Sequence, residues 1–322
     1  MSWERRAESI AGGQKMQPQL VQHSEGPTRA DIPRVSGADI PAALELHRHE
    51  RRPLVLQGAA ADWKAVNKWT PAYLAEIVGD VEVTPSVGLP DTEVPYNNRA
   101  EEFRKSMTMR EFAELMDSGD RCYIGQAPIG DLPGLEHDFD FASLAPANVI
   151  EVAFWMGTST RSGMHYDNVD NLFAQVHGTK LAILAAPEEV YNLHLFPDSH
   201  SKSQVAPEHP DLKAHPRFAR AKLMQATLEP GDMLYLPRAW WHYFASSESS
   251  ISLSCWHGDL LTPRYDLQVM MRMRSPKVWA LLARDFVAQA MNRPQNERLF
   301  SPPSTGRQLY QLVSSKFSRR EH

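Results

Sequence analysis

Two stretches decide the fold of this chain: residues 165–187, HYDNVDNLFAQVHGTKLAILAAP, and residues 228–256, LEPGDMLYLPRAWWHYFASSESSISLSCW. Both contain apolar runs of strand length, rich in β-branched and aromatic residues, separated by turn signals. In the turn at 229–232, Pro230 presets φ and Gly231 supplies a positive φ. Many short strands between turns predict a mainly β domain, a barrel or sandwich, over residues 122–260.

The rest of the chain flanks this β region. Residues 1–33 are polar and lack periodicity, which predicts a flexible N-terminal arm. Residues 34–121 alternate short strands with amphipathic helices, and we expect them to pack on the core. Residues 197–217, PDSHSKSQVAPEHPDLKAHPR, are polar and rich in proline and predict a surface insertion. Residues 261–322 return to a helical pattern and predict a C-terminal helical segment.

Composition narrows the class of protein. Of 322 residues, 42% are apolar and 23% are charged, which is ordinary for a globular protein. The net charge of −5 gives no footprint for nucleic acid, so no DNA partner is expected. Two cysteines, Cys122 and Cys255, predict reduced thiols rather than a disulfide scaffold. No signal peptide or membrane span is visible, and a cytoplasmic protein is expected.

The motif that carries chemistry is His165-Tyr166-Asp167 with a distant His242. In an extended strand, His165 and Asp167 face the same side, and His242 can complete a triangle. Two histidines and one carboxylate on one face leave positions open on Fe(II). A His-x-Asp pair alone is a weak signal, because a histidine is more often a hydrogen-bonded structural residue. Lys180 begins an apolar strand, and an unpaired buried charge is very costly. Its ammonium group therefore either lies in solvent at the strand end or pairs with a carboxylate of a bound dicarboxylate.

Together the two stretches resemble the JmjC/cupin-like hydroxylase family, in particular the asparagine hydroxylases that act on hypoxia-inducible factor and small JmjC-only hydroxylases. Residues 52–74, RPLVLQGAAADWKAVNKWTPAYL, resemble that family's opening segment, so the likeness runs from about residue 35 to 260. The resemblance implies a double-stranded β-helix, a cupin-like jelly-roll core. It also implies a dioxygenase that uses Fe(II), 2-oxoglutarate as cosubstrate and O₂, with succinate and CO₂ as co-products.

The resemblance also implies roles for individual residues. It makes His165, Asp167 and His242 the catalytic iron ligands, and it makes Lys180 the partner of the C5 carboxylate of 2-oxoglutarate. Further pocket roles fall to Tyr123, Asn171 and Ser162, for which a core tyrosine, a strand-edge amide and a turn serine are the structural alternatives. Ser254 departs from the asparagine of the family, so orientation of the cosubstrate can differ there.

The substrate stays open at this level. Hydroxylation of a protein or peptide side chain is the leading interpretation, with a small metabolite or natural product, or a modified tRNA nucleoside, as alternatives for the same chemistry. A cupin-type metal-binding isomerase and a silent binding module are the alternatives outside the oxygenases. Relatives pair through C-terminal helices, which implies a homodimer. Histidines near the 197–217 segment, including His194 and His215, predict either solvated side chains or a second metal site.

Overall fold

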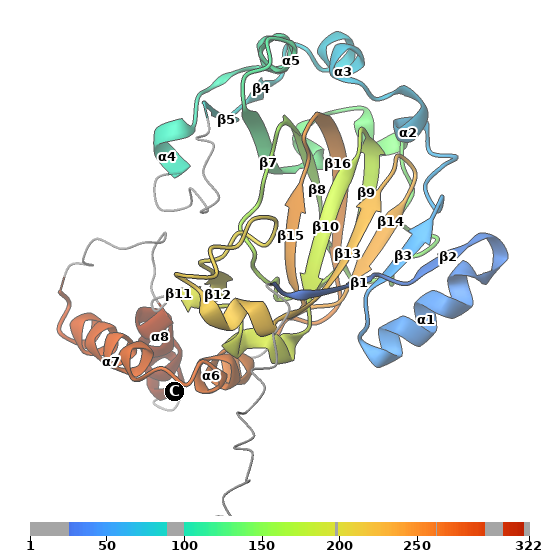
Figure 1. Ribbon diagram of the computed structural model, residues 1–322. Helices are drawn as coiled ribbons and strands as arrows, with labels where there is room; N and C mark the ends of the chain where they lie inside the picture. Colours follow the sequence, from blue (N-terminus) through green and yellow to red (C-terminus); the bar gives the residue numbers. More distant parts are fainter. Residues whose placement is uncertain (1–25, 89–99, 197–198, 262, 294–304, 319–322) are drawn as a thin grey trace, which may run out of the picture.

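Two facing sheets form the body of the protein (Figure 1). The structure is a computed structural model that describes residues 26–88, 100–196, 199–261, 263–293 and 305–318. The large sheet has the order β2 (Arg34–Ser36), β3 (Leu54–Gln57), β14 (Met233–Leu236), β9 (Asp170–His177), β16 (Ser249–His257), β8 (Val149–Thr158), β7 (Cys122–Pro128) and β5 (Ser86–Val87). The small sheet has the order β1 (Thr28–Asp31), β13 (Lys222–Leu228), β10 (Lys180–Ala185) and β15 (Trp241–Ala245). The expected mainly β, jelly-roll core is confirmed.

Helices and two small sheets surround this body. The N-terminal helices are α1 (Ile40–Glu50), α2 (Lys64–Lys68), α3 (Pro71–Ile77), α4 (Ala100–Phe103) and α5 (Met109–Asp117). The C-terminal segment contains α6 (Pro263–Arg272), α7 (Pro276–Ala290) and α8 (Thr305–Ser318). Two-stranded sheets pair β4 (Glu82–Val83) with β6 (Met107–Thr108) and β11 (Leu195–Phe196) with β12 (Ser199–Ser203).

Helix starts follow capping chemistry that is visible in the sequence. Thr108 and Glu111 form a reciprocal capping box at the start of α5, and Phe112 and Met116 on its inner face are buried. The Thr70 side chain accepts the backbone N–H of Tyr73 at the start of α3. These helices therefore begin where local hydrogen bonding satisfies their free N–H groups.

Alternation along the strands divides the side chains between two environments. Leu172, Ala174 and Val176 of β9 point outward into a hydrophobic cluster beneath the N-terminal helices. Asn171, Phe173 and Gln175 of the same strand are also buried but lie outside that cluster, facing the space between the sheets. Strand β16 follows the same rule, with Ile251, Leu253 and Cys255 outward and Ser252, Ser254 and Trp256 inward. The polar inward residues predict a site between the sheets.

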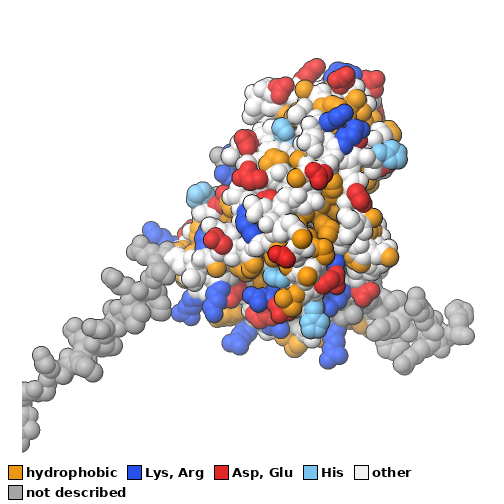
Figure 2. Space-filling view, turned by 90° about the vertical axis from the view of Figure 1, so that its right-hand side faces the viewer, with side chains coloured by type: hydrophobic (Ala, Val, Ile, Leu, Met, Phe, Trp, Pro, Cys, Tyr) orange, Lys and Arg blue, Asp and Glu red, His pale blue; other side chains and the backbone are white. Residues whose placement is uncertain are grey.

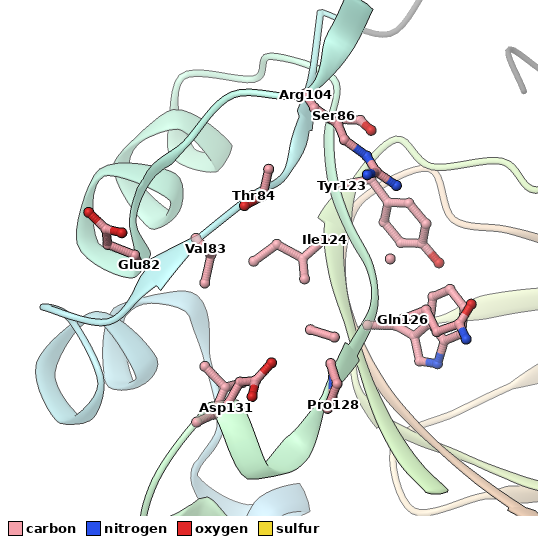
Figure 3. A pocket seen from close by; sticks show the side chains of 14 residues that line it. Glu82, Val83, Thr84, Ser86, Arg104, Tyr123, Ile124, Gln126, Pro128 and Asp131 are labelled. Atoms are coloured by element: carbon pink, nitrogen blue, oxygen red, sulfur yellow. The ribbon is translucent and has the colours of Figure 1, made fainter. Parts of the chain in front are cut away.

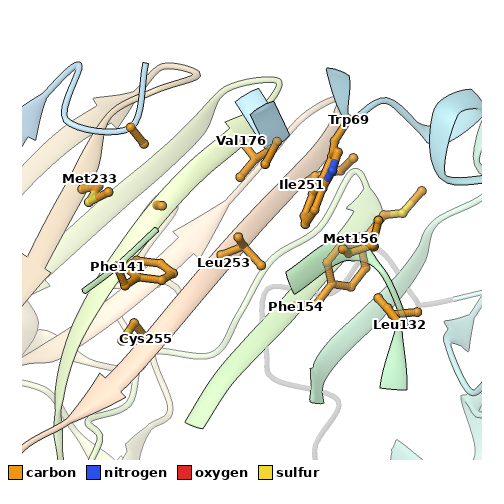
Figure 4. Packing of buried hydrophobic residues seen from close by; sticks show 14 of the residues in the cluster. Trp69, Leu132, Phe141, Phe154, Met156, Val176, Met233, Ile251, Leu253 and Cys255 are labelled. Atoms are coloured by element: carbon orange, nitrogen blue, oxygen red, sulfur yellow. The ribbon is translucent and has the colours of Figure 1, made fainter. Parts of the chain in front are cut away.

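The outward cluster of the large sheet is the main core. Figure 4 shows Phe154 and Met156 of β8 beside Ile251 and Leu253 of β16, with Trp69 closing the cluster. These side chains are at most 1% exposed. Burial of each is worth about 1.5–3 kcal/mol, so this layer holds the sheet rigid behind the site.

Two expectations about the chain are corrected. Residues 28–31, expected within a flexible arm, form β1 and pair in parallel with β13; residues 1–25 lie outside the described residues. The 197–217 segment is more than a surface insertion, because β12 lies in it and Ser203 and Val205 are buried. In both cases the polar sequence hides a backbone that pairs with a sheet.

Two expectations about composition are tested by the structure. Cys122 and Cys255 are both buried and free, as predicted. Burial raises the pKa of the Cys122 thiol to about 12 and that of Cys255 to about 11. Within the described ranges, no helix is long and apolar enough to cross a membrane.

Candidate metal centre and cosubstrate pocket

His165, Asp167 and His242 lie close together beside strand β15. One ligand atom from each lies within 4.8 Å of the others, and they form the one such group of His, Cys, Asp or Glu among the described residues. His165 Nε2 is 3.8 Å from Asp167 Oδ1, and His242 Nε2 is 3.8 Å from Asp167 Oδ2. The predicted triangle is therefore present in space.

The backbone around His165 explains the grouping. It is an extended segment rather than the regular strand expected, with isolated bridges from His165 to His242 and to Lys202 of β12. The expected alternation still holds, because Tyr166 turns away and packs on Trp241 at 4.9 Å. Lys202 lies in the 197–217 segment, so that segment supports the first ligand.

Backbone carbonyls orient both imidazoles. His165 Nδ1 lies 2.7 Å from the carbonyl of Gly163, and His242 Nδ1 lies 3.1 Å from the carbonyl of Trp240. When each Nδ1 donates to its carbonyl, both Nε2 atoms present lone pairs toward Asp167. This is the tautomer that metal binding requires.

The electrostatics of His242 also suit a metal ligand. Burial, and then the neighbouring His165, lower the pKa of His242, while Asp167 opposes the shift. The His242 side chain is 4% exposed, whereas those of His165 and Asp167 are 33% and 25% exposed. The group therefore opens toward solvent on the side of His165 and Asp167, where O₂ and a substrate can approach.

One partner of the carboxylate was not predicted from sequence. The Trp256 indole N–H donates to Asp167 Oδ2 at 3.2 Å, and the ring of Trp256 lies edge-on to that of Trp155 at 6.1 Å. The inward position of Trp256, two residues beyond Ser254 on β16, was a signal that could have identified it. The nearby carboxylate of Asp170 lies outside the metal group and accepts the backbone N–H of Arg238 at 2.8 Å.

Lys180 is buried between the sheets. Its ammonium donates to Ser252 Oγ at 2.7 Å and lies 5.3 Å from the centre of the Phe173 ring. Burial lowers the pKa of Lys180 to about 7. The solvent-exposed alternative is excluded, and no carboxylate of the described chain is within ion-pair distance of this ammonium.

Ser254 belongs to a network of inward side chains. Its hydroxyl oxygen accepts the indole N–H of Trp155 at 3.0 Å and the amide of Asn171 at 3.3 Å. Both lone pairs are thereby used, and the hydroxyl hydrogen is left to donate. Asn171 Oδ1 is buried without a hydrogen-bond partner in the described structure. Tyr123 stacks on Trp155 at 6.0 Å and so lies beside this network.

Ser162 is hydrogen-bonded to the backbone of β15. Its hydroxyl accepts the backbone N–H of Phe244 at 2.8 Å, and its own N–H donates to the Phe244 carbonyl at 2.8 Å. This geometry matches the turn-serine alternative, and the pocket role of Ser162 stays a prediction.

Near the 197–217 segment, His194 and His215 lie together and belong to no metal group among the described residues, whereas His209 is exposed. His194 Nε2 accepts the backbone N–H of Arg217 at 3.1 Å, and its ring lies 5.0 Å from that of His215. Burial, more than the nearby Arg217, lowers the pKa of His194 to about 4. His194 is therefore a structural acceptor rather than a solvated side chain.

Comparisons with known proteins identify the family of the chain. The family model of the cupin-like domain matches residues 41–262. The chain is 30% identical over 218 residues to Lysine-specific demethylase 8 of Xenopus tropicalis, covering 64% of this chain and 48% of that protein. It is 27% identical over 241 residues to Jumonji C domain-containing protein 5 of Drosophila melanogaster, covering 71% and 60% respectively.

A second group of relatives bears a different name. The chain is 28% identical over 260 residues to tRNA wybutosine-synthesizing protein 5 of Danio rerio, covering 74% of this chain and 78% of that protein. The chain spans about half to three fifths of the length of the first two relatives, those of Xenopus tropicalis and Drosophila melanogaster. The names of these relatives refer to lysine demethylation in one case and to tRNA wybutosine synthesis in another.

Proposed function

Because the chain belongs to the cupin-like family, in agreement with its resemblance to JmjC-type hydroxylases, we propose that it is an Fe(II)- and 2-oxoglutarate-dependent dioxygenase that hydroxylates a protein or peptide side chain. The single observation that carries this proposal is the pairing of the three-residue metal group with a buried lysine on one inner surface. A metal group alone is compatible with a cupin isomerase. Lys180 adds a cation that only a bound anion can balance.

The residues present fit both Fe(II) and 2-oxoglutarate. Two Nε2 atoms and one carboxylate are the donor set that leaves positions open on Fe(II). The buried ammonium of Lys180 is costly unless an anion is bound, and a dicarboxylate supplies the charge that Lys180 needs. When bound, Fe(II), 2-oxoglutarate and O₂ supply the oxidising chemistry, and the co-products are succinate and CO₂.

The protein's own residues have distinct tasks in this proposal. His165, Asp167 and His242 hold the metal, and Trp256 fixes one carboxylate oxygen by its N–H. Lys180 binds the C5 carboxylate of 2-oxoglutarate, and Ser252 holds the Lys180 ammonium in place. Tyr123, Asn171 and Ser254 line the cavity between these ends, where the Ser254 hydroxyl can donate. The sheets exclude water from this space.

A modified tRNA nucleoside is the second candidate substrate. The guanidiniums of Arg217 and Arg274 lie 4.4 Å and 5.6 Å from the centre of the Tyr191 ring, an arrangement that suits stacking and phosphate contacts. On the face shown in Figure 2, acidic and basic side chains are interspersed, and the cations gather toward its lower edge. The tRNA wybutosine-synthesizing relatives support this candidate.

Turnover in the absence of substrate tests the class of enzyme. The full chain is loaded with Fe(II) without oxygen, O₂ is admitted, and succinate formed from 2-oxoglutarate is measured. We expect metal-dependent succinate in the wild type, none in His165→Ala or Asp167→Ala, and retained formation in Asp170→Asn, whose carboxylate lies outside the metal group. Absence of succinate in the wild type, or its survival in both alanine variants, would refute the proposal.

Mass spectrometry then separates the substrates. Peptide pools and total tRNA are incubated with the active enzyme, and products heavier by one oxygen identify the class of substrate.

A homodimer through the C-terminal helices is part of the same proposal, supported by the exposed Trp279, Val287 and Met291 of this region. We also propose a cytoplasmic location, which the two free thiols favour.

A further inference from the structure

Strands β5 and β7 pair at one end and separate at the other. Ser86 pairs with Tyr123, and the backbone N–H of Gly88 donates to the carbonyl of Arg121 at 2.9 Å. Before Ser86 the chain leaves β7, because the Pro85 carbonyl accepts the N–H of Lys105 at 3.0 Å. Strand β4, which precedes it, pairs with β6 instead. Beyond Tyr123, β7 has no neighbouring strand on this side among the described residues.

The separation forms a cleft of about 430 Å³. Val83 and Thr84 line one side of it, and β7 from Tyr123 to Pro128 lines the other. Figure 3 shows Thr84 and Ile124 on one side of β7, and Tyr123 and Gln126 on the side nearer the barrel. Trp155 also lines the cleft.

The backbone of β7 offers hydrogen-bonding groups to this cleft. In an antiparallel ladder, alternate residues direct both N–H and C=O to the same neighbour. Arg121 and Tyr123 face β5, so Gly125 is the next residue to face that side. The register with β8 then shifts between Ile124 and Ala127, as in a bulge. The N–H and C=O of Gly125 therefore point where β5 would have continued.

Three further features distinguish this edge. Gln126, in the bulge, has a φ of 55°, an uncommon conformation for a residue other than glycine and one that clusters at functional sites. Pro128 ends the strand, and proline within a sheet occurs at edges. The charges also differ along the cleft, with Arg104 at one end and Asp131 at the other (Figure 3).

We propose that an extended peptide segment of the substrate adds to this edge of β7 at Gly125, in the line that β5 leaves at Ser86. One peptide residue accepts the N–H of Gly125 and donates to its C=O, as in strand addition. Arg104 and Asp131 favour a peptide with an acidic residue near one end and a basic residue near the other. The proposal rests on the proposed function for the claim that this peptide is the substrate.

The position of the cleft connects it to the metal group. Trp155, in the cleft wall, lies edge-on to Trp256 at 6.1 Å, and Trp256 donates to Asp167. Two aromatic rings thus separate the cleft from the metal ligand. A side chain on the barrel side of the bound peptide is directed toward this wall.

Binding without turnover tests the edge directly. The full chain, loaded with Zn(II) in place of iron, selects binders from a bead library of acetylated and amidated decapeptides. The best binder is then methylated at one backbone nitrogen at a time, and affinities are measured by fluorescence anisotropy. We expect one position at which methylation weakens binding about fivefold to tenfold, with both neighbours nearly unaffected because their N–H groups point away.

A pair of variants at Gly125 tests whether the backbone N–H of this residue contributes to peptide binding. Gly125→Pro removes the N–H and should weaken binding by a similar factor, whereas Gly125→Ala keeps the N–H and measures the effect of the added Cβ alone, which would lie 3.2 Å from the Tyr123 ring. Thermal unfolding shows whether each variant folds, and the methylation series on the wild type decides the matter if the proline variant does not. No selected binder, or a methylation series without a single sensitive position, overturns the proposal.

The two proposals fail separately. Loss of the methylation pattern with intact succinate formation refutes the edge site alone. The pattern without succinate formation leaves the edge site standing and refutes the oxygenase.

Discussion

Replacing Lys180 by methionine should stabilise the ligand-free protein and abolish binding of 2-oxoglutarate. Burial lowers the pKa of Lys180 from 10.5 to about 7, which corresponds to about 5 kcal/mol of unfavourable free energy for the charged form. Methionine of similar length loses the contacts to Ser252 and Phe173, together about 2 kcal/mol. The expected net gain in the free energy of unfolding is about 3 kcal/mol at about pH 6.

The sign of the pH dependence makes this prediction strict. Between pH 7 and 10.5 the unfolded chain keeps a proton that the folded chain has lost, so wild-type stability rises with pH. The advantage of Lys180→Met should therefore nearly vanish at about pH 9. Urea unfolding of the ligand-free proteins at about pH 6 and about pH 9 measures the difference in stability between Lys180→Met and wild type. Calorimetry measures the binding of 2-oxoglutarate. Lys222→Met, at an exposed lysine on β13, is the control and should change stability little. A Lys180→Met variant less stable than wild type at both pH values would refute the reasoning.

Three further predictions follow from the same structure. Because Lys180 must be charged to bind a carboxylate, the affinity for 2-oxoglutarate should fall about tenfold per pH unit above about pH 7; calorimetry should show proton uptake, and a flat profile would contradict this. Trp256→Phe removes the N–H donor to Asp167 and should weaken metal binding about tenfold at unchanged fold; an unaltered metal affinity in a competition assay with a chelating dye would count against it. Asp232→Ala removes a buried carboxylate that accepts the backbone N–H groups of Gly58 and Glu229 and pairs with Arg34, and should cost about 2–4 kcal/mol in urea unfolding; a loss under about 0.5 kcal/mol would show that this turn is held by its backbone.

The sequence predicted the parts of the site that depend on alternation. His165 and Asp167 are two residues apart in an extended segment, so their shared side follows from backbone geometry. Lys180 begins a strand whose other inward residues are apolar, which is why its burial could be anticipated as one of two alternatives.

What the sequence did not predict depends on pairing between distant segments. Alternation from Ser254 places Trp256 on the inward face of β16, but its contact with Asp167 depends on how β16 lies beside the His165 segment, which alternation does not predict. The 197–217 segment is polar because one of its faces meets solvent, yet its backbone supplies β12 and the bridge to His165. Polar composition therefore predicted a loop, whereas backbone hydrogen bonding, which is indifferent to side-chain polarity, determined the outcome.

The inward face of β16 also works as a ruler. Ser252 touches the lysine and Trp256 touches the metal-binding carboxylate, and the two are four residues apart on one strand, about 14 Å at ~3.4 Å per residue. Hydrogen bonds to β8 and β9 on both sides prevent that strand from stretching. In the proposed enzyme, this fixed separation would set the span between the Asp167 carboxylate and the Lys180 ammonium that the metal and a dicarboxylate cosubstrate together must bridge.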